Sequence, residues 1–562
     1  MLYPKTNESR IAISLHGLWK FQLVEDPYQP VHPLTSFRWI GVPSSYNDLY
    51  ATKDIRDHVG LVCYETDITI PKTTTPSTWS LRIGAAGNRA KVYLDGQLLT
   101  EHNGGFLPID CDLKTQVGVH RLSIVLDNRL DFATLPPGEI IAGRQEIHYD
   151  FRNFTGIHRN VYLYSRPIQP IEDIVIETEV NGTIALVTYT ITSEQDCHVE
   201  ILDPTGILVA TARGNTGTIE LKQPSLWDIG QGQLYTFKAT SDTDTYSELF
   251  GIRTVEVKDN QFLLNGRPVY FQGFGMHEDH ETIGKGSFSA LNVRDFSLLQ
   301  WIGANSFRTS HYPYDEEMYE LADRLGILVI NEMPAVGMNF WSPRQVFQDG
   351  VLDQTTKDVY RTQFDELIAR DKNHPSIVMY SLANEANTHE AGALSFFEDL
   401  FTHAREQTKL PLMIVEWVGA KDNKVAHLAD VIGLNQYFGW YLDFSRIETI
   451  KDKLTNALQE YHDKFHKPIL LTEFGADTIA GLHKLPSVAF SEEFQVEFIE
   501  AYLDVIHNVD YVIGEHVWNF ADFDTKPGLN RFDGNKKGVF TRNRQPKMVA
   551  HVLRQAWKGK NK

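Results

Sequence analysis

Two glutamates stand where long apolar runs of the sequence end. Glu385 closes the run 377–385 (IVMYSLANE), and Glu473 closes the run 468–473 (PILLTE). A carboxylate beside buried apolar residues is costly unless it has a partner or a task. Two carboxyl groups that face each other across a pocket can supply the acid and the nucleophile that break a glycosidic bond. The two glutamates therefore predict a site that cleaves glycosides.

The elements that hold these glutamates are predicted to be strands buried on both faces, as in a parallel sheet covered by helices. After Gly251 the order strand, loop, helix repeats, with amphipathic stretches at 315–325 and 358–370. The candidate strands are 268–275, 304–309, 327–332, 377–385, 413–417, 431–437, 469–473 and 512–518. Eight strands within roughly 250 residues are typical of a (β/α)8 TIM barrel, which builds its active site at the carboxyl ends of the strands. We predict such a barrel at the C-terminal end.

Several predicted strands end in acidic or hydrogen-bonding residues. These are Glu332, Asn384, Glu385, Glu416, Asn435, Tyr437, Glu473, Trp518 and Asn519. Glu385 and Glu473 close the fourth and seventh strands, so they would flank a sugar from opposite sides of the barrel mouth. For Glu332, Glu416 and Glu515 a structural carboxylate with satisfied hydrogen bonds is the simpler interpretation. The chemistry is therefore assigned to Glu385 and Glu473.

The residues before Gly251 are predicted to form two β-sandwiches. From 11 to about 164, short alternating segments are separated by Gly, Pro, Asn and Asp turns, which indicates an all-β sandwich. Residues 165–170 (SRPIQP) contain two prolines and are predicted to be a linker. A second alternating set predicts a smaller sandwich, with strands at 184–191, 198–201 and 234–239.

Composition limits the partners that this chain can have. Its 562 residues are 42% hydrophobic and 22% charged, which indicates a globular protein of several domains. Lys and Arg number 53 against 73 Asp and Glu, a formal charge of -20. This charge argues against nucleic acid or an anionic membrane as a partner. An acidic substrate would need a local basic cluster.

Cysteine usage and the apolar segments predict the compartment. Cys63, Cys111 and Cys197 show neither a disulfide framework nor metal spacing, which favours a reducing compartment. Residues 1–10 (MLYPKTNESR) contain no apolar signal core, and no segment approaches about 18 uninterrupted apolar residues. We expect a cytoplasmic protein without a membrane span.

A set of motifs carries a resemblance to glycoside hydrolase family 2. The motifs are 156–159 (GIHR), 305–313 (NSFRTSHYP), 384–385 (NE), 472–475 (TEFG) and 517–523 (VWNFADF). The resemblance covers nearly the whole chain and implies three domains in order. These are a jelly-roll sugar-binding domain at 1–166, an immunoglobulin-like sandwich at 167–253 and the catalytic barrel at 254–562.

The resemblance also implies roles for the residues at the two strand ends. Glu385 would be the acid/base and Glu473 the nucleophile of a retaining hydrolase, whose two carboxyl groups lie ~5 to 5.5 Å apart. Asn384 would hydrogen-bond the 2-hydroxyl of the sugar. Family members usually have Pro after Asn-Glu, whereas Ala386 follows here. That difference removes no reacting group.

Within the family, residues 535–538 (NKKG) resemble a loop of the β-glucuronidases. By that resemblance Asn535 and Lys537 would hold the C6 carboxylate of glucuronate, with help from Arg531. A buried carboxylate needs such compensation. An exposed, solvated turn is the alternative explanation of this loop. The implied activity is that of a retaining exo-β-D-glucuronidase acting on a small-molecule β-glucuronide.

Further positions fall where the family contacts its sugar. They are Asp150, His311, Asn435, Tyr437, Tyr441 and Trp518. Asp150 would reach the barrel mouth from the first domain. Each of these residues also has a packing role as an alternative, since Tyr and Trp at strand ends are often core residues.

No cofactor and no metal are expected. His277 and His280 lie three residues apart, whereas the HExxH zinc motif places its histidines four apart. No segment completes a nucleotide-binding fingerprint. In the loop from Gly337 to about Asp353, Phe340, Trp341 and Phe347 could form a platform for hydrophobic aglycones, or they could pack within an ordinary loop.

Two other functions remain open from the sequence. The first is another family 2 activity, such as that of a β-galactosidase or β-galacturonidase, which the loop at Lys537 argues against. The second is a carbohydrate-binding protein without catalysis, which the presence of Glu385 and Glu473 argues against. By analogy with the family, we expect a homo-oligomer.

Overall fold

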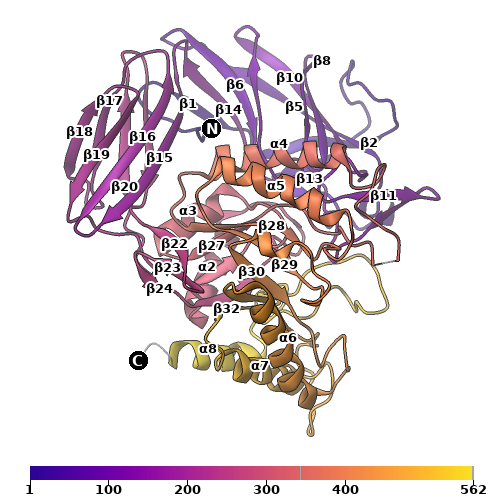
Figure 1. The fold of residues 1–562 in the computed structure, drawn as a ribbon. Helices are drawn as coiled ribbons and strands as arrows, with labels where there is room; N and C mark the ends of the chain where they lie inside the picture. Colours follow the sequence, from indigo (N-terminus) through magenta and orange to yellow (C-terminus); the bar gives the residue numbers. More distant parts are fainter. Residues whose placement is uncertain (342, 560–562) are drawn as a thin grey trace.

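The computed structural model describes residues 1–341 and 343–559. Figure 1 shows two regions of β-sheet beside a barrel that is surrounded by helices. Residue 342, in the predicted platform loop, and residues 560–562, at the end of the predicted barrel domain, lie outside this description. Of the helices described, none has both the length and the apolar composition needed to cross a bilayer.

The first sandwich contains β1 (Ile11–Ser14), β2 (Gly17–Val24), β3 (Arg38–Val42), β4 (Ser44–Ser45), the short helix α1 (Lys53–Arg56), β5 (Leu61–Ile70), β6 (Ser77–Ile83), β7 (Arg89–Leu94), β8 (Gln97–Asn103), β9 (Ile109–Leu113), β10 (Gly118–Asp127), β11 (Gly138–Ile141), β12 (Arg144–Ile147), β13 (Gly156–Ile157) and β14 (Val161–Pro167). Its main sheets have the strand orders β1-β14-β6-β9 and β3-β2-β5-β10-β7-β8. Phe21, Leu81 and Ile124 are among the side chains buried between them. The predicted jelly-roll sandwich is confirmed.

The predicted linker at 165–170 is wrong in its first half. Strand β14 continues to Pro167, which pairs with Ser77 at the end of β6. Proline lacks an N–H, yet it is tolerated at the end of a strand where no further ladder bond is needed. Residues 168–170 alone connect the two sandwiches.

The second sandwich contains β15 (Ile171–Asn181), β16 (Ile184–Ser193), β17 (His198–Leu202), β18 (Leu208–Arg213), β19 (Thr216–Lys222), β20 (Tyr235–Thr240) and β21 (Thr245–Phe250). Its sheets have the orders β15-β16-β19 and β18-β17-β20-β21. Along β16, Val187, Tyr189 and Ile191 are buried while Thr188 and Thr190 between them are exposed. This alternation is the sequence pattern that predicted the sandwich.

The barrel is closed and has the strand order of the chain. It consists of β25 (Phe271–Gly275), β26 (Ser306–Arg308), β27 (Leu328–Glu332), β28 (Ile377–Asn384), β29 (Leu412–Glu416), β30 (Val431–Asn435), β31 (Ile469–Glu473) and β32 (Val512–Val517). Every residue of β28 and β31 is buried, as expected for strands covered on both faces. All eight predicted strands are confirmed.

The first predicted barrel strand, 268–275, starts too early. Pro268 belongs instead to a small antiparallel sheet formed by β22 (Val255–Lys258), β23 (Gln261–Leu264) and β24 (Arg267–Pro268). Proline cannot donate to the parallel ladder, so β25 begins only at Phe271. Phe262 and Leu264 share a buried cluster with Phe271 and other barrel side chains. They close the end of the barrel opposite the candidate site.

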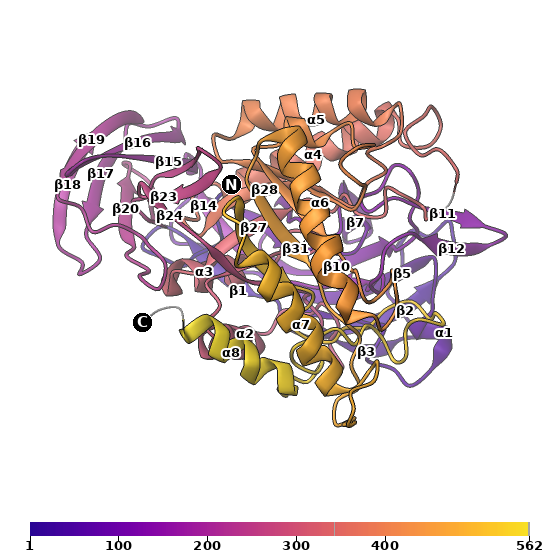
Figure 2. The same ribbon diagram turned by 60° about the horizontal axis from the view of Figure 1, so that its bottom comes forward.

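Helices surround the barrel. They are α2 (Ser289–Ile302), α3 (Glu316–Leu325), α4 (Gln354–Asp371), α5 (Ala393–Gln407), α6 (Ile450–Phe465), α7 (Glu492–Ile506) and α8 (Met548–Gly559), with 3-10 turns η1 (Ala426–Leu428) and η2 (Ile447–Thr449). Figure 2 shows α6 and α7 as neighbours on the barrel wall. The predicted helices at 315–325 and 358–370 correspond to α3 and α4, and the Asp315 side chain caps α3 by accepting from the Glu317 N–H.

Candidate active site

The predicted residues meet at one end of the barrel. Asn384, Asn435 and Glu473 are the last residues of β28, β30 and β31, and Glu385 follows β28 directly. Parallel strands of a barrel all end at the same rim. The side chains of these four residues therefore share the barrel mouth.

Glu473 is buried and receives two donors. Arg308 Nη2 lies 2.6 Å from Oε1, and the Tyr437 hydroxyl donates to Oε2 at 2.8 Å. Burial raises the pKa of Glu473 to about 7, while Arg308 lowers it and repulsion from Glu385 raises it. Near neutral pH this carboxyl group can exist in either protonation state.

Glu385 sits at a sharp turn of the backbone. Its φ of 53° lies in the left-handed region, which costs a non-glycine residue roughly 1 kcal/mol or more. The turn is fixed by its N–H, which donates to Val415 O at 2.9 Å. Asn435 Nδ2 donates to Glu385 Oε1 at 2.9 Å, and burial raises the pKa of this carboxyl group.

The two glutamates influence each other's charge. The charge of Glu385 contributes to the raised pKa of Glu473. Two neighbouring carboxyl groups that are both hard to ionise hold one proton between them. Glu473 has a cationic donor in Arg308, whereas the donor to Glu385 is the neutral amide of Asn435. A charge-assisted bond favours the negative charge on Glu473 and therefore the proton on Glu385.

The amides beside the glutamates have fixed orientations. Thr472 Oγ1 donates to Asn435 Oδ1 at 2.8 Å, so Nδ2 of Asn435 points to Glu385. The same Nδ2 lies 3.2 Å from Asn384 Oδ1. Arg308 Nη1 approaches that oxygen at 3.5 Å. Asn384 therefore has its carbonyl held and its amino group left for another acceptor.

Arg308 was not among the predicted site residues. It ends β26 with no exposed surface and binds both oxygens of Glu332 through Nη1, at 2.7 and 2.8 Å. Burial opposes ionisation of Glu332, yet Arg308 and His311 hold its pKa below the usual value. The available signal was a charged residue in a predicted barrel strand, and Arg308 lay within the motif 305–313.

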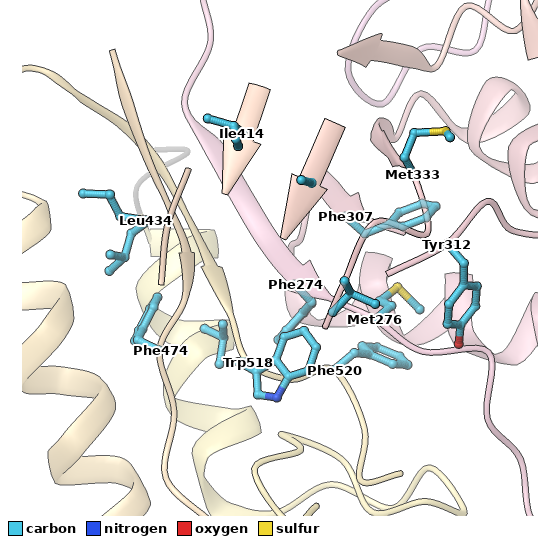
Figure 3. Close-up of a cluster of buried hydrophobic side chains, with 14 of the residues drawn as sticks. Phe274, Met276, Phe307, Tyr312, Met333, Ile414, Leu434, Phe474, Trp518 and Phe520 are labelled. Carbon is cyan, nitrogen blue, oxygen red and sulfur yellow. The ribbon is translucent and has the colours of Figure 1, made fainter. Parts of the chain in front are cut away.

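His311 and Trp518 form one wall of the site. His311 Nδ1 lies 2.7 Å from Glu332 Oε1, and its ring stacks on Trp518 with centroids 5.1 Å apart. Trp518 is almost fully buried, and Figure 3 shows its indole beside Phe274 and Phe520. Trp518 therefore packs in the core and contacts a predicted sugar-binding histidine at the same time.

Lys537 is buried and paired. Only 1% of its surface is exposed, and Asn535 is equally enclosed. Its Nζ bonds the Asp477 carboxylate and lies 2.8 Å from the Tyr441 hydroxyl. The alternative of a solvated turn at 535–538 is wrong, because Asn535, Lys537 and Gly538 are buried, and Lys537 contacts Asp477 after β31 and Tyr441 after β30.

Asp150 links the first domain to this loop. Arg531 Nε donates to both its oxygens at 2.8 Å, and Asn535 Nδ2 donates to Oδ2 at 2.9 Å. Arg531 Nη2 also reaches the Tyr441 hydroxyl at 2.6 Å. The structure thus brings Asp150, Arg531, Asn535 and Tyr441 together beside Lys537.

Asp477 is a second residue that the sequence interpretation missed. It follows β31 and binds Lys537, with Arg531 Nη1 at 3.6 Å. Burial acts against its ionisation, but Lys537 and Arg531 hold its pKa below the usual value. Two cations and two carboxylates thus form one network at this side of the mouth, and no spacing rule in the sequence pointed to Asp477.

Tyr437 bridges the network and the glutamates. Its hydroxyl donates to Glu473, and its ring packs edge-on against Tyr441 with centroids 5.1 Å apart. Burial raises its pKa well above the usual value, so it stays a donor. All predicted site residues therefore lie within one connected region.

Glu416 and Glu515 lie outside the network at the mouth. Glu416 accepts from Thr388 Oγ1 at 2.6 Å, and burial raises its pKa to about 7. Glu515 binds His507 and Trp557 at 3.0 Å each, which are contacts below the rim. The partners of Glu515 fit the structural role expected for it, whereas Oε1 of Glu416 is buried without a hydrogen-bond partner among the described residues.

Residues 277–280 (HEDH) are occupied by other contacts. His277 Nδ1 pairs with the Tyr312 hydroxyl at 3.1 Å. Asp279 binds Arg542, and the first domain reaches Glu278 through Arg159. Within the described residues, no group of three or more His, Cys, Asp or Glu is arranged to hold a metal ion.

The prediction that three aromatic side chains of the loop 337–353 form a platform is wrong for two of them. Phe340 is buried and stacks on His148 at 4.2 Å, and Phe347 packs against Phe396 at 5.0 Å. Both therefore belong to the core between the loop and its neighbours. Trp341 alone is exposed, with its ring 5.1 Å from that of Trp417.

Comparison with known families assigns each region of the chain. Residues 12–167 match "Glycosyl hydrolases family 2, sugar binding domain", residues 169–253 match "Glycosyl hydrolases family 2", and residues 255–561 match "Glycosyl hydrolases family 2, TIM barrel domain". These matches span nearly the whole chain, in the order of the three observed regions.

Similar proteins extend over the full length. A β-glucuronidase from Paenibacillus borealis is 42% identical, covering 99% of this chain and 98% of its own. A solved β-D-glucuronidase structure from Dictyoglomus thermophilum has 43% identity and a TM-score of 0.96, covering 99% of both chains. The Ruminococcus gnavus β-glucuronidase in complex with C6-substituted uronic isofagomine has 37% identity and a TM-score of 0.95, again covering 99% of both. With these matches and the barrel-mouth geometry together, the chain belongs to glycosyl hydrolase family 2 and is a glycoside hydrolase.

Proposed function

We propose that this protein is a retaining exo-β-D-glucuronidase that releases glucuronate and an alcohol from β-D-glucuronides. The observation that carries the proposal is the buried Lys537, with Asn535 and Arg531 beside it, at the same barrel mouth as Glu385 and Glu473. Full-length similarity to β-glucuronidases supports the same sugar. Asp477 and Asp150 already pair with these cations, so a bound uronate would share Lys537 and Arg531 with them.

The first step forms a bond between Glu473 and the sugar. A Glu473 oxygen attacks the anomeric carbon while Glu385 gives its proton to the glycosidic oxygen, and the alcohol leaves. In the second step Glu385 takes a proton from water, whose oxygen displaces Glu473 from the anomeric carbon. The product keeps the β configuration, since both steps invert it.

The contacts in the free site support this division of roles. Arg308 and Tyr437 donate to Glu473, and both bonds favour the carboxylate that attacks. Glu385 has only the neutral Asn435 donor, so it keeps its proton more readily. The environments thus separate two groups of the same type into nucleophile and acid.

The proposed binding site of the glucuronate carboxylate is the network of Lys537, Arg531, Asp477 and Asp150. In the free site Lys537 binds Asp477, and Arg531 binds Asp150. A glucuronate carboxylate would join these cations with bidentate or charge-assisted bonds. The enclosed Lys537 closes this end of the proposed pocket, which supports action on a terminal sugar only. We propose contacts with the sugar hydroxyls from Asp150, His311, Asn384, Asn435, Tyr437, Tyr441 and Trp518.

A panel of p-nitrophenyl glycosides tests the sugar, and proton NMR tests the stereochemistry. We expect release of nitrophenol from the β-D-glucuronide far faster than from the β-D-galactoside, β-D-glucoside or β-D-galacturonide. The first sugar seen by NMR should be β-glucuronate, before mutarotation. Faster galactoside hydrolysis, or α-glucuronate as the first product, would contradict the proposal.

The remaining predictions about the molecule are proposals as well. We propose domain limits of 1–166, 167–253 and 254–562, which the family matches at 12–167, 169–253 and 255–561 support. A homo-oligomer and a cytoplasmic location stay predictions from analogy and cysteine usage. Sedimentation of the full chain tests the first, and a mass near 64.1 kDa would rule out an oligomer.

A further inference from the structure

Every backbone N–H and C=O group of residues 536–538, the irregular segment that carries Lys537, has a hydrogen-bond partner. The three N–H groups donate to side-chain oxygens of Asp477, Asn535 and Asp522, at 2.8, 3.0 and 3.0 Å. Outside helices and sheets, such groups commonly bond to water. In this segment side chains of the protein take that place.

The carbonyl groups of the same segment are held by two buried side chains. Lys547 Nζ donates to Lys536 O at 2.8 Å. Gln495 Nε2 lies 3.3 Å from Lys537 O and 3.2 Å from Gly538 O. Lys547 and Gln495 are each 1% exposed, so solvent does not compete for these bonds. The backbone on both sides of Lys537 is therefore fixed by groups that the proposed chemistry does not use.

Lys547 joins the two chain segments that meet at the proposed uronate site. Besides the carbonyl of the irregular segment, its Nζ donates to Thr478 O at 3.0 Å, directly after Asp477. It also pairs with Asp522 Oδ1 at 2.8 Å. One ammonium group thus connects the neighbours of Asp477 and of Lys537, and it sets the spacing between these two ion-paired residues.

The buried pair of Lys547 and Asp522 is a poor source of stability. Asp522 is 4% exposed and Lys547 is 1% exposed, so both charges have lost most of their water. Apolar side chains of similar volume often replace such a pair without loss of stability, because desolvation offsets the attraction between the charges. Apolar side chains cannot supply the directed bonds to the backbone of residues 478, 536 and 538. The contribution of the pair therefore lies in where it holds these peptide groups.

The position of Lys537 matters because its ammonium group already has a partner. Asp477 binds it in the free site, and a uronate would have to share it. The side chain of lysine is long and flexible, so an unanchored backbone would let Lys537 follow Asp477 away from the sugar. Ordering such a segment upon binding would cost free energy, which an anchored segment avoids. The anchored cation is thus ready for an anion at one place.

Building on the proposed glucuronidase activity, we propose that Lys547, Asp522 and Gln495 are positioning residues that make the site selective for acidic sugars. They act through Lys537 and do not contact the sugar. They hold residues 536–538 so that the Lys537 ammonium group meets the C6 carboxylate. Their effect is therefore confined to ligands that carry this carboxylate.

Two inhibitors with the same ring test this proposal, because uronic isofagomine carries a carboxylate where isofagomine carries a hydroxymethyl group. Calorimetry gives the dissociation constant of each. For Lys547→Met we expect that of uronic isofagomine to rise about tenfold and that of isofagomine less than about twofold, since a displaced group weakens a directed contact. Arg544→Met is the matched control, because Arg544 is also buried and pairs with Asp295 at 2.8 Å. It should keep the ratio of the two constants.

Two further variants keep the test decisive. Gln495→Met leaves no buried charge unpaired, so it should fold even if the loss of Lys547 beside Asp522 prevents folding. It should weaken uronic isofagomine about threefold, as expected for lost neutral hydrogen bonds, and leave isofagomine unchanged. In a Lys537→Ala background, Lys547→Met should cause no further change in the ratio, because the group it positions is gone. Equal weakening of both inhibitors, or a full further loss in that background, would overturn the positioning role.

The wild-type protein separates this proposal from the proposed function. If it binds isofagomine as tightly as uronic isofagomine, uronate recognition itself is wrong, and the positioning role falls with it. If it prefers uronic isofagomine and the variants keep that preference, the glucuronidase assignment stands and the positioning role alone is overturned.

Discussion

At the residue scale, Arg308 organises the charges of the site. It touches Glu332 and Glu473 without any exposed surface, so its charge is held by two carboxylates and not by water. Removal of either partner would leave a buried charge unpaired. Because Arg308 contacts Glu473 directly, it favours the negative charge on Glu473 over that on Glu385.

The pH dependence of kcat/KM follows from these charges. In the proposed mechanism Glu473 is ionised and Glu385 protonated, and burial raises the pKa of both, that of Glu473 to about 7. We expect a bell-shaped profile whose acid limb lies well above the ordinary Glu pKa of about 4.3.

The Glu385→Gln variant tests the assignment of the two limbs. On methyl glucuronide it should lose about 10² to 10⁴ in kcat, since no acid remains. With 2,4-dinitrophenyl glucuronide, which leaves without a proton, it should keep the acid limb and lose the alkaline one. An alkaline limb that persists in this variant would assign the acid to another group.

Lys537 should determine selectivity between sugars. In the Lys537→Ala variant, kcat/KM on p-nitrophenyl β-D-glucuronide should fall about a hundredfold, because a charge-assisted bond to the uronate is lost. The slow rate on the β-D-glucoside should change little. Lys536→Ala is the matched control, since the Lys536 side chain pairs with the exposed Asp533 at 2.9 Å. Equal losses on both sugars would count against uronate binding by Lys537.

At the scale of elements, the strand ends position the chemistry. Glu473 and Glu385 are held because β31 and β28 are buried along their whole length, and the rim places their ends together. Just beyond β31, the chain passes very close to β32. A Cβ on Gly475 would lie 1.9 Å from the carbonyl oxygen of Trp518.

Gly475→Ala should therefore disturb the nucleophile. The backbone has to move, which we expect to cost about 1 to 3 kcal/mol of stability and to lower kcat. Gly419→Ala is the control, because nothing lies within 4 Å of a Cβ there. Thermal unfolding and kcat should both report the difference, and identical behaviour of the two variants would show that the rim tolerates the shift.

At the scale of the whole molecule, the first domain completes the site in the barrel. Asp150 reaches Arg531 and Asn535, and Arg152 binds Asp524. Arg159 is buried between the domains, with Nη2 2.6 Å from Pro313 O and 3.1 Å from Glu278. These contacts fix the domain that carries Asp150 against the barrel.

Arg159→Met should loosen this junction. It leaves the Glu278 carboxylate without its cation, and we expect a loss of about 3 kcal/mol in denaturant unfolding. The KM for glucuronides should rise because Asp150 loses its fixed position, whereas kcat should change less. Arg166→Met, which removes a partly exposed pair with Asp112, serves as the control. A variant with unchanged stability and KM would show that Arg159 does not set the domain position.

Much of the site could be predicted from local patterns. Buried strands such as β28 and β31 are continuous apolar runs, and their terminal glutamates are visible without any tertiary information. Strand limits were less accurate where Pro268 and Pro167 decide pairing. The positions of Asp150 and Lys537 followed only from resemblance, because their partners lie far away along the chain, 381 residues for Asp150 with Arg531 and 60 for Lys537 with Asp477.

The sequence by itself determined the two sandwiches, the eight-stranded barrel and the pair of glutamates at strand ends, since alternation and apolar runs are local properties. Only the tertiary structure decided which charged groups meet. Arg308 with Glu332 and Asp477 with Lys537 are brought together because neighbouring barrel strands pair side by side, β26 with β27 and β31 with β32. It also decided that Phe340 and Phe347 are core while Trp341 is exposed, because burial depends on neighbours that lie far away in the chain.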